Sequence, residues 1–287
     1  MLSSSSTKSY AISNAVDTGA SITTNLSTTL QLGGGSYSAC LSVDVKELLY
    51  VIPTNGSTTG FSTINPFTGV RTSYTAGNRV LNSIAVTFSG VVFMSTGGNT
   101  VYAAGGSYGS FADPTLLFTV SNGILDSIGV DDAGQNVYLI ETTGTNLCKF
   151  NAWSGGTATR TVLESAPYLK RVGVDNSTGD IYLNDVGNYV ARYVNNGGTM
   201  NLAYSKYPFN AANAPKFNID NTVVIYDSSV GRIKTPNPAG DITVATLTVN
   251  DYSTATGTDI IPSRTTRSYY SVSFNNPNTV TVFPSSY

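Results

Sequence analysis

The sequence predicts an all-β protein, a six-bladed β-propeller, and three observations support this prediction. First, a unit of similar sequence recurs along the 287 residues with a period near 44. Second, each unit holds about four runs of β-favouring residues. Third, no helical period continues for about 10 residues, and most of the glycines and prolines fall between the runs. A repeat of this length with about four strands is the signature of a propeller blade.

The segment 171–198 shows the unit most clearly. Val172 and Val174 alternate with small residues and indicate a first strand, which the turn-forming sequence 176–180 ends. The run 181–183 and the run 189–194 predict the next strands, and two asparagines and two glycines close the unit. Each unit is therefore expected to fold as strand, turn, strand, short loop and strand.

The residue before the first turn of each unit serves as an anchor for comparing the units. These anchors are Val43, Val86, Val130, Val174, Ile219 and Phe274, with separations of 43, 44, 44, 45 and 55 residues. The long fifth unit predicts an inserted loop at 250–264. The predicted blades span 39–78, 79–121, 122–165, 166–211, 212–267, and 268–287 completed by 8–32.

The last unit supplies only two predicted strands before the sequence stops at Tyr287. Residues 8–32 resemble the second half of a repeat and compare with residues 188–204. The simplest arrangement is one domain over residues 1–287, in which strands from both termini complete the sixth blade. Such closure would leave no open edge between the first and last blades.

Composition excludes several classes of function. Charged residues are 11% of the chain, against about 25% in typical proteins, and the net charge is −2. Because the chain has no basic cluster, nucleic-acid binding is not expected. It also has no histidine, which removes the commonest general base and metal ligand. Cys40 and Cys148 are expected to be buried free thiols rather than a bridge.

The N-terminal sequence 1–13 lacks the apolar core of a signal peptide, and no 18-residue apolar run occurs in the chain. Membrane insertion is therefore not expected. An uncharged polar composition without a secretion signal is typical of a virion protein, which is made in a cytoplasm and works outside cells. The predicted location is thus a virion or the extracellular space; a leader removed earlier is the alternative explanation.

Two acidic positions recur in the units. The first directly follows the anchor, and its members are Asp44, Asp131, Asp175 and Asp220. These could form a ring of carboxylates, but the turn-rich sequences after them favour side chains that accept hydrogen bonds from backbone N–H groups two residues on.

The second acidic position follows the second strand of the unit, and its members are Glu141, Asp185 and Asp227. Oxygen ligands that converge there could hold Ca²⁺, which prefers six to eight of them. These three residues are the candidate metal ligands. No other cofactor is predicted, and the chain has no D-x-D-x-D-G calcium loop.

Loop tyrosines are the candidate contact residues, because tyrosine offers a flat apolar face and a hydroxyl at low entropic cost. The chain has 18 tyrosines, and most of those in strands need no functional explanation. We expect binding contacts in the loops 105–113 and 250–264. The predicted contact residues are Tyr108, Phe111, Asp113, Tyr252 and Thr254.

The unit V-x-V-D-x-x-x-G-x-[IV]-Y-[LV] resembles the repeat of NHL-type propellers and of the related regucalcin, gluconolactonase and antibiotic-lyase propellers. The resemblance is clearest over residues 122–235. It implies a propeller fold. It argues against the activities of that group, because its lyases use histidine and its lactonases use Glu, Asn and Asp metal ligands that match no particular positions here. Nucleophile and nucleotide motifs such as G-x-S-x-G and the P-loop are missing as well.

The first functional hypothesis is a non-enzymatic structural or attachment propeller on the exterior of a virus or phage particle. Its partners would be other capsid, spike or tail proteins, or host glycans, within a larger assembly. The alternative is a secreted or surface lectin-like propeller that binds carbohydrate. A third hypothesis is a metal-dependent lyase or lactonase that uses the three candidate metal ligands.

Overall fold

The computed structural model describes most of the chain. The described residues are 22–25, 41–52, 59–68, 70–142, 146–165, 169–175, 178–185, 190–196, 199–206, 215–217, 223–227, 232–235, 242–246, 259–266, 268–272 and 279–284. They contain strands and one short 3-10 turn, Ala76–Asn78, so the prediction of an all-β fold is confirmed. Within these residues no helix is long and apolar enough to span a bilayer.

The described strands form six antiparallel sheets of four strands, which we number in chain order. Sheet 1 holds β2 (Leu41–Val43), β3 (Leu49–Val51), β4 (Phe61–Ile64) and β5 (Arg71–Tyr74). Sheet 2 holds β6 (Leu81–Val86), β7 (Val92–Thr96), β8 (Thr100–Ala104) and β9 (Thr115–Thr119). Sheet 3 holds β10 (Ile124–Val130), β11 (Asn136–Glu141), β12 (Asn146–Ser154) and β13 (Thr157–Ser165).

The other three sheets complete the set. Sheet 4 holds β14 (Leu169–Val174), β15 (Ile181–Asp185), β16 (Val190–Asn196) and β17 (Thr199–Lys206). Sheet 5 holds β18 (Lys216–Phe217), β19 (Val223–Asp227), β20 (Arg232–Thr235) and β21 (Ile242–Thr246). Sheet 6 holds β22 (Asp259–Pro262), β23 (Ser268–Val272), β24 (Thr279–Pro284) and, from the other end of the chain, β1 (Ile22–Asn25).

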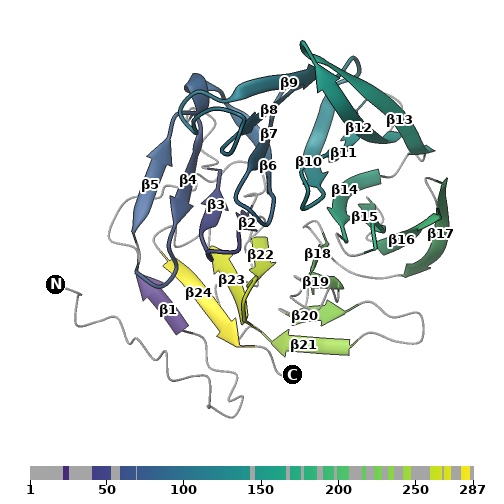
Figure 1. Ribbon diagram of the computed structural model, residues 1–287. Helices are drawn as coiled ribbons and strands as arrows, with labels where there is room; N and C mark the ends of the chain where they lie inside the picture. Colours follow the sequence, from purple (N-terminus) through teal and green to yellow (C-terminus); the bar gives the residue numbers. More distant parts are fainter. Residues whose placement is uncertain are drawn as a thin grey trace.

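The sheets lie around a common centre (Figure 1). The first strand of each sheet is nearest the centre, and the last strand is on the outside, as β5, β9, β13 and β17 show most clearly. The inner strands contact one another in the order β2, β6, β10, β14, β18 and β22, and β22 also contacts β2. We call these six the inner strands.

The hydrophobic core is divided among the gaps between neighbouring sheets. One cluster joins sheets 2 and 3, where the rings of Phe118 and Phe150 stack with centroids 4.8 Å apart. A second joins sheets 1 and 2 around Tyr50, Phe61 and Met94. Further clusters join sheet 3 to sheet 4 and sheet 4 to sheet 5. Each sheet is therefore stabilised mainly by its neighbours, as in other repeat proteins.

The first recurring acidic position caps turns, as predicted. Asp44 Oδ1 accepts hydrogen bonds from the backbone N–H groups of Lys46 (2.8 Å) and Leu48 (3.0 Å). Asp131 Oδ1 accepts one from Gln135 N (2.8 Å). Asp220 lies outside the described residues. The side chains of Asp44 and Asp131 therefore hold turns, as the alternative to a ring of carboxylates predicted.

Sheets 2 and 6 fill the same turn position with hydroxyl residues. In sheet 2, Thr87 Oγ1 accepts a hydrogen bond from Val91 N at 3.0 Å. In sheet 6, Ser263 Oγ accepts bonds from the N–H groups of Thr265 (3.1 Å) and Thr266 (2.8 Å). A hydroxyl oxygen can accept these bonds as a carboxylate does, so the turn is kept without the aspartate.

The placement of the sixth repeat was wrong. Residues 259–262 are a strand that pairs with β23, so they belong to sheet 6 and not to the predicted inserted loop or to a blade over 212–267. The end of this strand, Pro262, lies 88 residues after Val174, which is two repeats of 44. The anchor expected at Phe274 lies outside the described residues. The error arose because Ser263, and not aspartate, marks this turn.

The share of each terminus in sheet 6 also differs from the prediction. Three strands, β22 to β24, come from the C-terminal part of the chain, where two were expected. The N-terminal part supplies β1, which pairs with β24 in the register Ile22 to Val282 through Asn25 to Thr279. The rest of the predicted segment 8–32 lies outside the described residues.

Glycines allow the inner strands to approach one another closely. A Cβ atom on Gly173 would lie 2.3 Å from the carbonyl oxygen of Pro215, and one on Gly129 would lie 2.8 Å from a methyl group of Val174. Neither glycine has a positive φ angle. The space between strands, and not the backbone conformation, therefore requires glycine at these two positions.

We expect Gly173→Ala to lower the free energy of unfolding by about 1–3 kcal/mol, because the added methyl group forces β14 away from Pro215. Urea unfolding measures this change. Gly97→Ala is the matched control, because a Cβ atom on Gly97 meets nothing within 4 Å. Equal stability of the two variants would contradict this account of the inner strands.

A buried carboxylate joins sheet 1 to sheet 6. Glu47, in the turn between β2 and β3, is 4% exposed. Its carboxylate accepts hydrogen bonds from Ser263 Oγ (3.0 Å), Arg264 N (2.8 Å) and Tyr270 Oη (2.6 Å). Burial and the bond to Glu47 raise the pKa of Tyr270 above its usual range, so this hydroxyl stays a donor. Glu47 has a φ of 62°, which is unusual for a residue other than glycine.

Replacing Glu47 with Gln should lower the free energy of unfolding by roughly 2–4 kcal/mol, because an amide offers one acceptor oxygen to three donors. Glu164→Gln makes the same change of charge at a half-exposed residue that accepts a hydrogen bond from the backbone N–H group of its own neighbour, Ser165. That control should stay within about 0.5 kcal/mol of the parent chain. A similar loss in both variants would refute a special role for Glu47.

Candidate functional site

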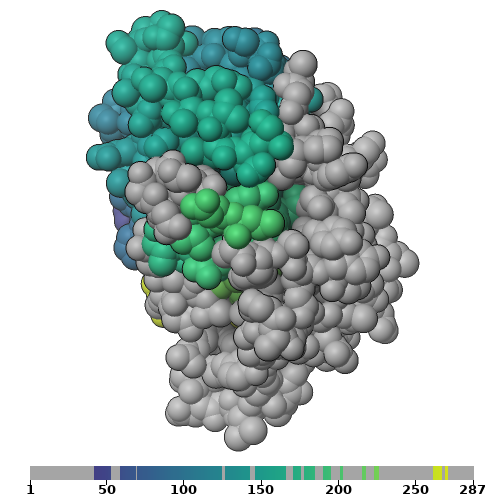
Figure 2. Space-filling model, turned by 90° about the vertical axis from the view of Figure 1, so that its right-hand side faces the viewer, coloured from purple at the N-terminus to yellow at the C-terminus, as the bar shows by residue number. Residues whose placement is uncertain are grey.

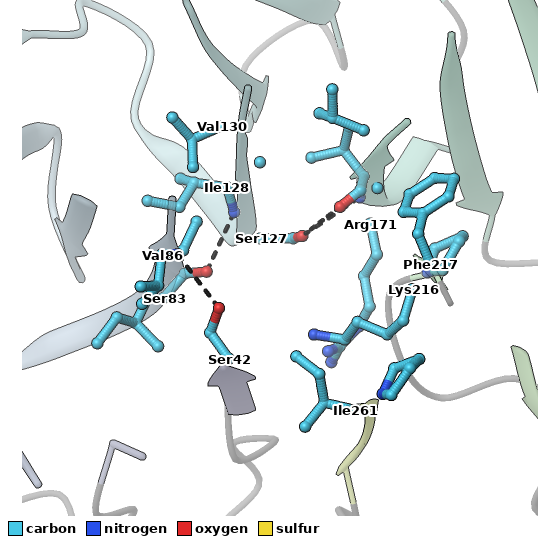
Figure 3. A pocket seen from close by; sticks show the side chains of 18 of the residues that line it. Ser42, Ser83, Val86, Ser127, Ile128, Val130, Arg171, Lys216, Phe217 and Ile261 are labelled. Atoms are coloured by element: carbon cyan, nitrogen blue, oxygen red, sulfur yellow. Dashed lines mark hydrogen bonds between the residues drawn. The ribbon is translucent and has the colours of Figure 1, made fainter. Parts of the chain in front are cut away.

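A cavity of about 100 Å³ lies where the inner strands meet, and all six of these strands contribute to its lining or its mouth (Figure 3). We call it the axial cavity. Its wall is apolar on the side of β6 and β10, through residues such as Ile84 and Ile128. Concave sites with apolar walls and a few convergent polar groups are the usual places for small ligands.

Serines on three of the inner strands bond to the next inner strand (Figure 3). Each serine oxygen accepts a hydrogen bond from a backbone N–H group of the neighbouring sheet. These bonds are Ser42 Oγ to Val86 N (3.2 Å), Ser83 Oγ to Ile128 N (3.0 Å) and Ser127 Oγ to Val172 N (3.2 Å). Ser127 Oγ also donates to Val172 O at 3.4 Å. The serines therefore connect strands, which satisfies backbone groups that have no ladder partner there.

Three cationic residues line the other side of the axial cavity. Arg171 is on β14, Lys216 begins β18, and Arg264 follows β22. Arg171 is 7% exposed, and it holds the position in β14 that Ser83 and Ser127 hold in β6 and β10, three residues before the anchor. The side chains of Arg171 and Lys216 reach toward the same part of the cavity, beside Ile261 (Figure 3).

Arg264 is held at the mouth of the axial cavity by groups from sheets 1 and 3. Its Nε donates to Val43 O at 3.4 Å, and its Nη2 lies 4.0 Å from Asp132 Oδ1. Among the described residues that line the cavity, none is acidic. The cavity therefore concentrates positive charge in a partly desolvated space, where charges interact more strongly than in water.

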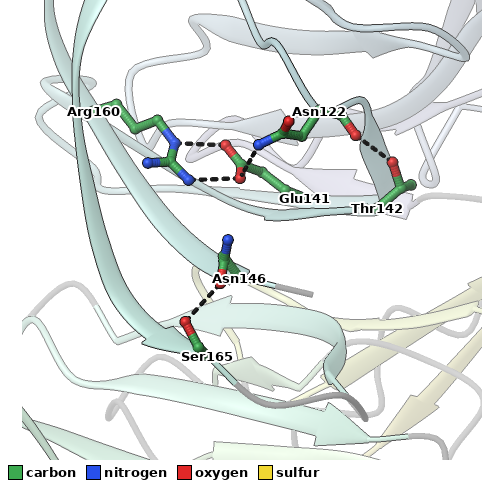
Figure 4. A network of polar contacts seen from close by, with 6 residues as sticks. All are labelled: Asn122, Glu141, Thr142, Asn146, Arg160 and Ser165. Atoms are coloured by element: carbon green, nitrogen blue, oxygen red, sulfur yellow. Dashed lines mark hydrogen bonds and ion pairs between the residues drawn. The ribbon is translucent and has the colours of Figure 1, made fainter. Parts of the chain in front are cut away.

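The candidate metal ligand Glu141 is engaged in a structural network (Figure 4). Its buried carboxylate accepts hydrogen bonds from Arg160 Nε and Nη2, each at 2.7 Å, and from Asn122 Nδ2 at 3.0 Å. Burial opposes ionisation, but these bonds outweigh it and hold the pKa of Glu141 below its usual value. The network joins β11, β13 and the turn before β10, so Glu141 has a stabilising role that needs no metal.

The side chains of the other two candidate ligands, Asp185 at the end of β15 and Asp227 at the end of β19, lie outside the part of the fold whose side chains are described. Within the described residues, no three acidic, cysteine or histidine side chains come together in a way that could hold a metal ion. Cys148 is a buried free thiol beside Glu141, as predicted for it. Burial, with the nearby carboxylate, raises its pKa to about 12.

The predicted contact loop 105–113 packs two of its side chains into the protein. The ring of Tyr108 meets Phe93 edge to face, with centroids 5.9 Å apart. The ring of Phe111 meets Tyr74 at 5.0 Å and Phe61 at 5.5 Å. These contacts give both aromatic residues a structural role at the gaps on either side of sheet 2.

Asp113 is exposed at the end of this loop, and its backbone N–H bonds to Ser110. Tyr252 and Thr254 lie outside the described residues. Binding by these five residues stays a prediction. The sequence pattern did not point to Arg171, Lys216 or Arg264. For Arg171 a signal was available, because a basic residue stands at a position of the repeat that holds serine in sheets 2 and 3.

No family model matches the sequence, and no curated protein matches it. Solved structures do resemble the fold. A luciferin-regenerating enzyme is similar with a TM-score of 0.63 and 12% identity, over 92% of this chain and 95% of that one. Virginiamycin B lyase from Staphylococcus aureus is similar with a TM-score of 0.56 and 13% identity, over 92% and 88%.

A structure of a nidogen and laminin complex is also similar, with a TM-score of 0.55 and 14% identity, over 83% of this chain and 92% of that one. At such identities the likeness concerns the fold alone. The resemblance to NHL-type and related β-propellers that the repeat unit indicated is confirmed at that level.

We expect Glu141→Gln to lower the free energy of unfolding at pH 7 by about 1–3 kcal/mol, because it removes the charged acceptor of the hydrogen bonds from Arg160 and Asn122. Since the folded pKa of Glu141 is lowered, its contribution is complete above the unfolded pKa of about 4.3 and is lost as the pH falls through the folded value. Urea unfolding from pH 7 to pH 3 should therefore show the two chains converging below about pH 4. A difference that stays constant over this range would contradict the ion pair.

Proposed function

We propose that this chain is a six-bladed β-propeller, closed by strands from both termini, that works as a non-enzymatic docking module in a larger assembly. The six four-stranded sheets, the contact of β22 with β2 and the pairing of β1 with β24 support the closed ring. The proposed place of action is the exterior of a virus or phage particle, which the uncharged polar composition suggests.

The observation that carries the docking function is a set of exposed apolar side chains on the outer strands. Leu116 on β9, Val162 on β13 and Leu202 on β17 are 42%, 43% and 56% exposed. They recur on three consecutive sheets, and we call them the rim residues. Figure 2 views the side of the molecule on which sheet 3 and sheet 4 lie.

The rim residues share one local geometry. A shift in strand register follows each of them, and the extra residues are Leu117, Leu163 and Ala203. Such a bulge bends an edge strand and interrupts its row of free backbone groups, which discourages the addition of another strand. A partner would therefore contact the rim through side chains. Leu117 and Leu163 pack inward at these bulges, which leaves Leu116 and Val162 facing outward.

The nidogen and laminin complex offers a precedent for a propeller fold in protein docking. The lectin-like alternative predicts glycan binding with several equivalents per chain, since repeated sites would gain avidity. The third hypothesis, a lyase or lactonase that uses Glu141, Asp185 and Asp227, is disfavoured because the Glu141 carboxylate is already bound by Arg160 and Asn122. A docking module is therefore the function that we favour.

The test combines fractionation with a rim variant. We expect the chain to sediment with particles from its source at a fixed ratio to a major coat protein, measured by mass spectrometry. The variant Leu116→Ser/Val162→Ser/Leu202→Ser should lose most of this association, by about tenfold or more, with little change in melting temperature. The substitutions remove apolar contacts only at the exposed rim, so the fold should persist.

The matched control is Val70→Ser/Val80→Ser, which makes the same kind of change at exposed residues outside β9, β13 and β17, 63% and 49% exposed. It should associate as the parent chain does. Absence of the chain from particles would exclude the virion as its place of action. If the rim variant and the control bound a captured partner equally, docking through the rim would be wrong. A glycan array with the free protein tests the lectin-like alternative.

A further inference from the structure

The axial cavity has features that the docking function does not use. Positive side chains enter it from β14, β18 and the segment after β22, whereas the opposite wall is apolar or serine. Since three different sheets supply these cations, local sequence cannot account for their meeting. Arg171 is buried, so it is not an ordinary solvated surface arginine.

Chemistry decides which class of ligand suits this cavity. An arginine presents a planar fork of N–H donors that fits a carboxylate or a phosphate, and a lysine adds a compact point charge. Ile261 and Val172 beside them would contact the carbon skeleton of a small organic acid.

Size limits the ligand further. A cavity of about 100 Å³ has room for several water molecules, because about 10–15 Å³ of such space is enough to hold one. That space suits a group of a few non-hydrogen atoms. The serine oxygens of β2, β6 and β10 already accept backbone hydrogen bonds, so they would not compete with the ligand for the cations.

We propose that the axial cavity is a binding site for a small oxyanion, a carboxylate or phosphate group, held by Arg171, Lys216 and Arg264. The site is independent of the rim residues, which lie on the outer strands. A partner or metabolite that carries such a group would bind on the axis while docking takes place at the rim.

The experiment uses the full-length chain and two probes, sodium malonate for a carboxylate and sodium phosphate. Isothermal titration calorimetry at constant ionic strength should show saturable binding of at least one probe, and the probe that binds identifies the chemistry. Lys216→Gln should weaken that binding by about tenfold, the usual order for one charge-assisted contact. Lys216 is half-buried at the start of β18, so this variant tests the site directly.

Lys46→Gln is the matched control, because it removes the same charge from an exposed turn outside the cavity. It should bind as the parent chain does. If Lys216→Gln does not fold, amide chemical shifts of the parent chain replace it: saturating probe should move the signals of Val172 and Phe217 more than those of Lys46. No saturable binding, equal weakening in both variants, or shifts that spare β14 and β18 would overturn the proposal.

Discussion

The close approach of the inner strands is the constraint on which the rest of this structure depends. At their closest points, neighbouring inner strands leave no room for a side chain between them, and inner strands of different sheets are not paired in a ladder. Gly129 and Gly173 meet the first condition, since any side chain there would strike the neighbouring strand. Ser42, Ser83 and Ser127 meet the second, because their hydroxyls replace ladder bonds between sheets.

The same constraint explains why the first and last sheets need their own connection. Sheets 1 to 4 follow one another without a break in the chain order, and their serines and core clusters join each to the next. The three C-terminal strands of sheet 6 return to sheet 1 across more than 200 residues of sequence, and only β1 lies close to β2 along the chain. The Glu47 carboxylate bridges this junction with three hydrogen bonds, one of them to a backbone N–H group.

Once the sheets are arranged in this way, the two surfaces that we propose for binding lie in separate parts of the molecule. Around the axis, the inner strands carry serine on one side and cationic side chains on the other. At the rim, the outer strands β9, β13 and β17 each expose an apolar residue before a bulge. The loop 105–113 belongs to neither surface, because Tyr108 and Phe111 are drawn into the core.

The sequence by itself determined the repeat, because strand, turn and capping residue are local features. The period near 44 and the capping role of Asp44 and Asp131 could be predicted from adjacent residues. At Ser263 a hydroxyl replaces the aspartate that marks the turn in other repeats. Because this marker was missing, the last repeat was misplaced. The resemblance to a propeller family depended on the same local pattern.

Only the tertiary structure decided which distant residues meet. The pairing of Glu141 with Arg160, the bridge from Glu47 to Tyr270 and the gathering of Arg171, Lys216 and Arg264 all join residues from different strands. No spacing in one sequence encodes these contacts, because they depend on how sheets pack around the axis. Carboxylates and aromatic rings that looked available for binding were therefore found in structural roles, and the cationic cavity emerged only once the sheets were in place.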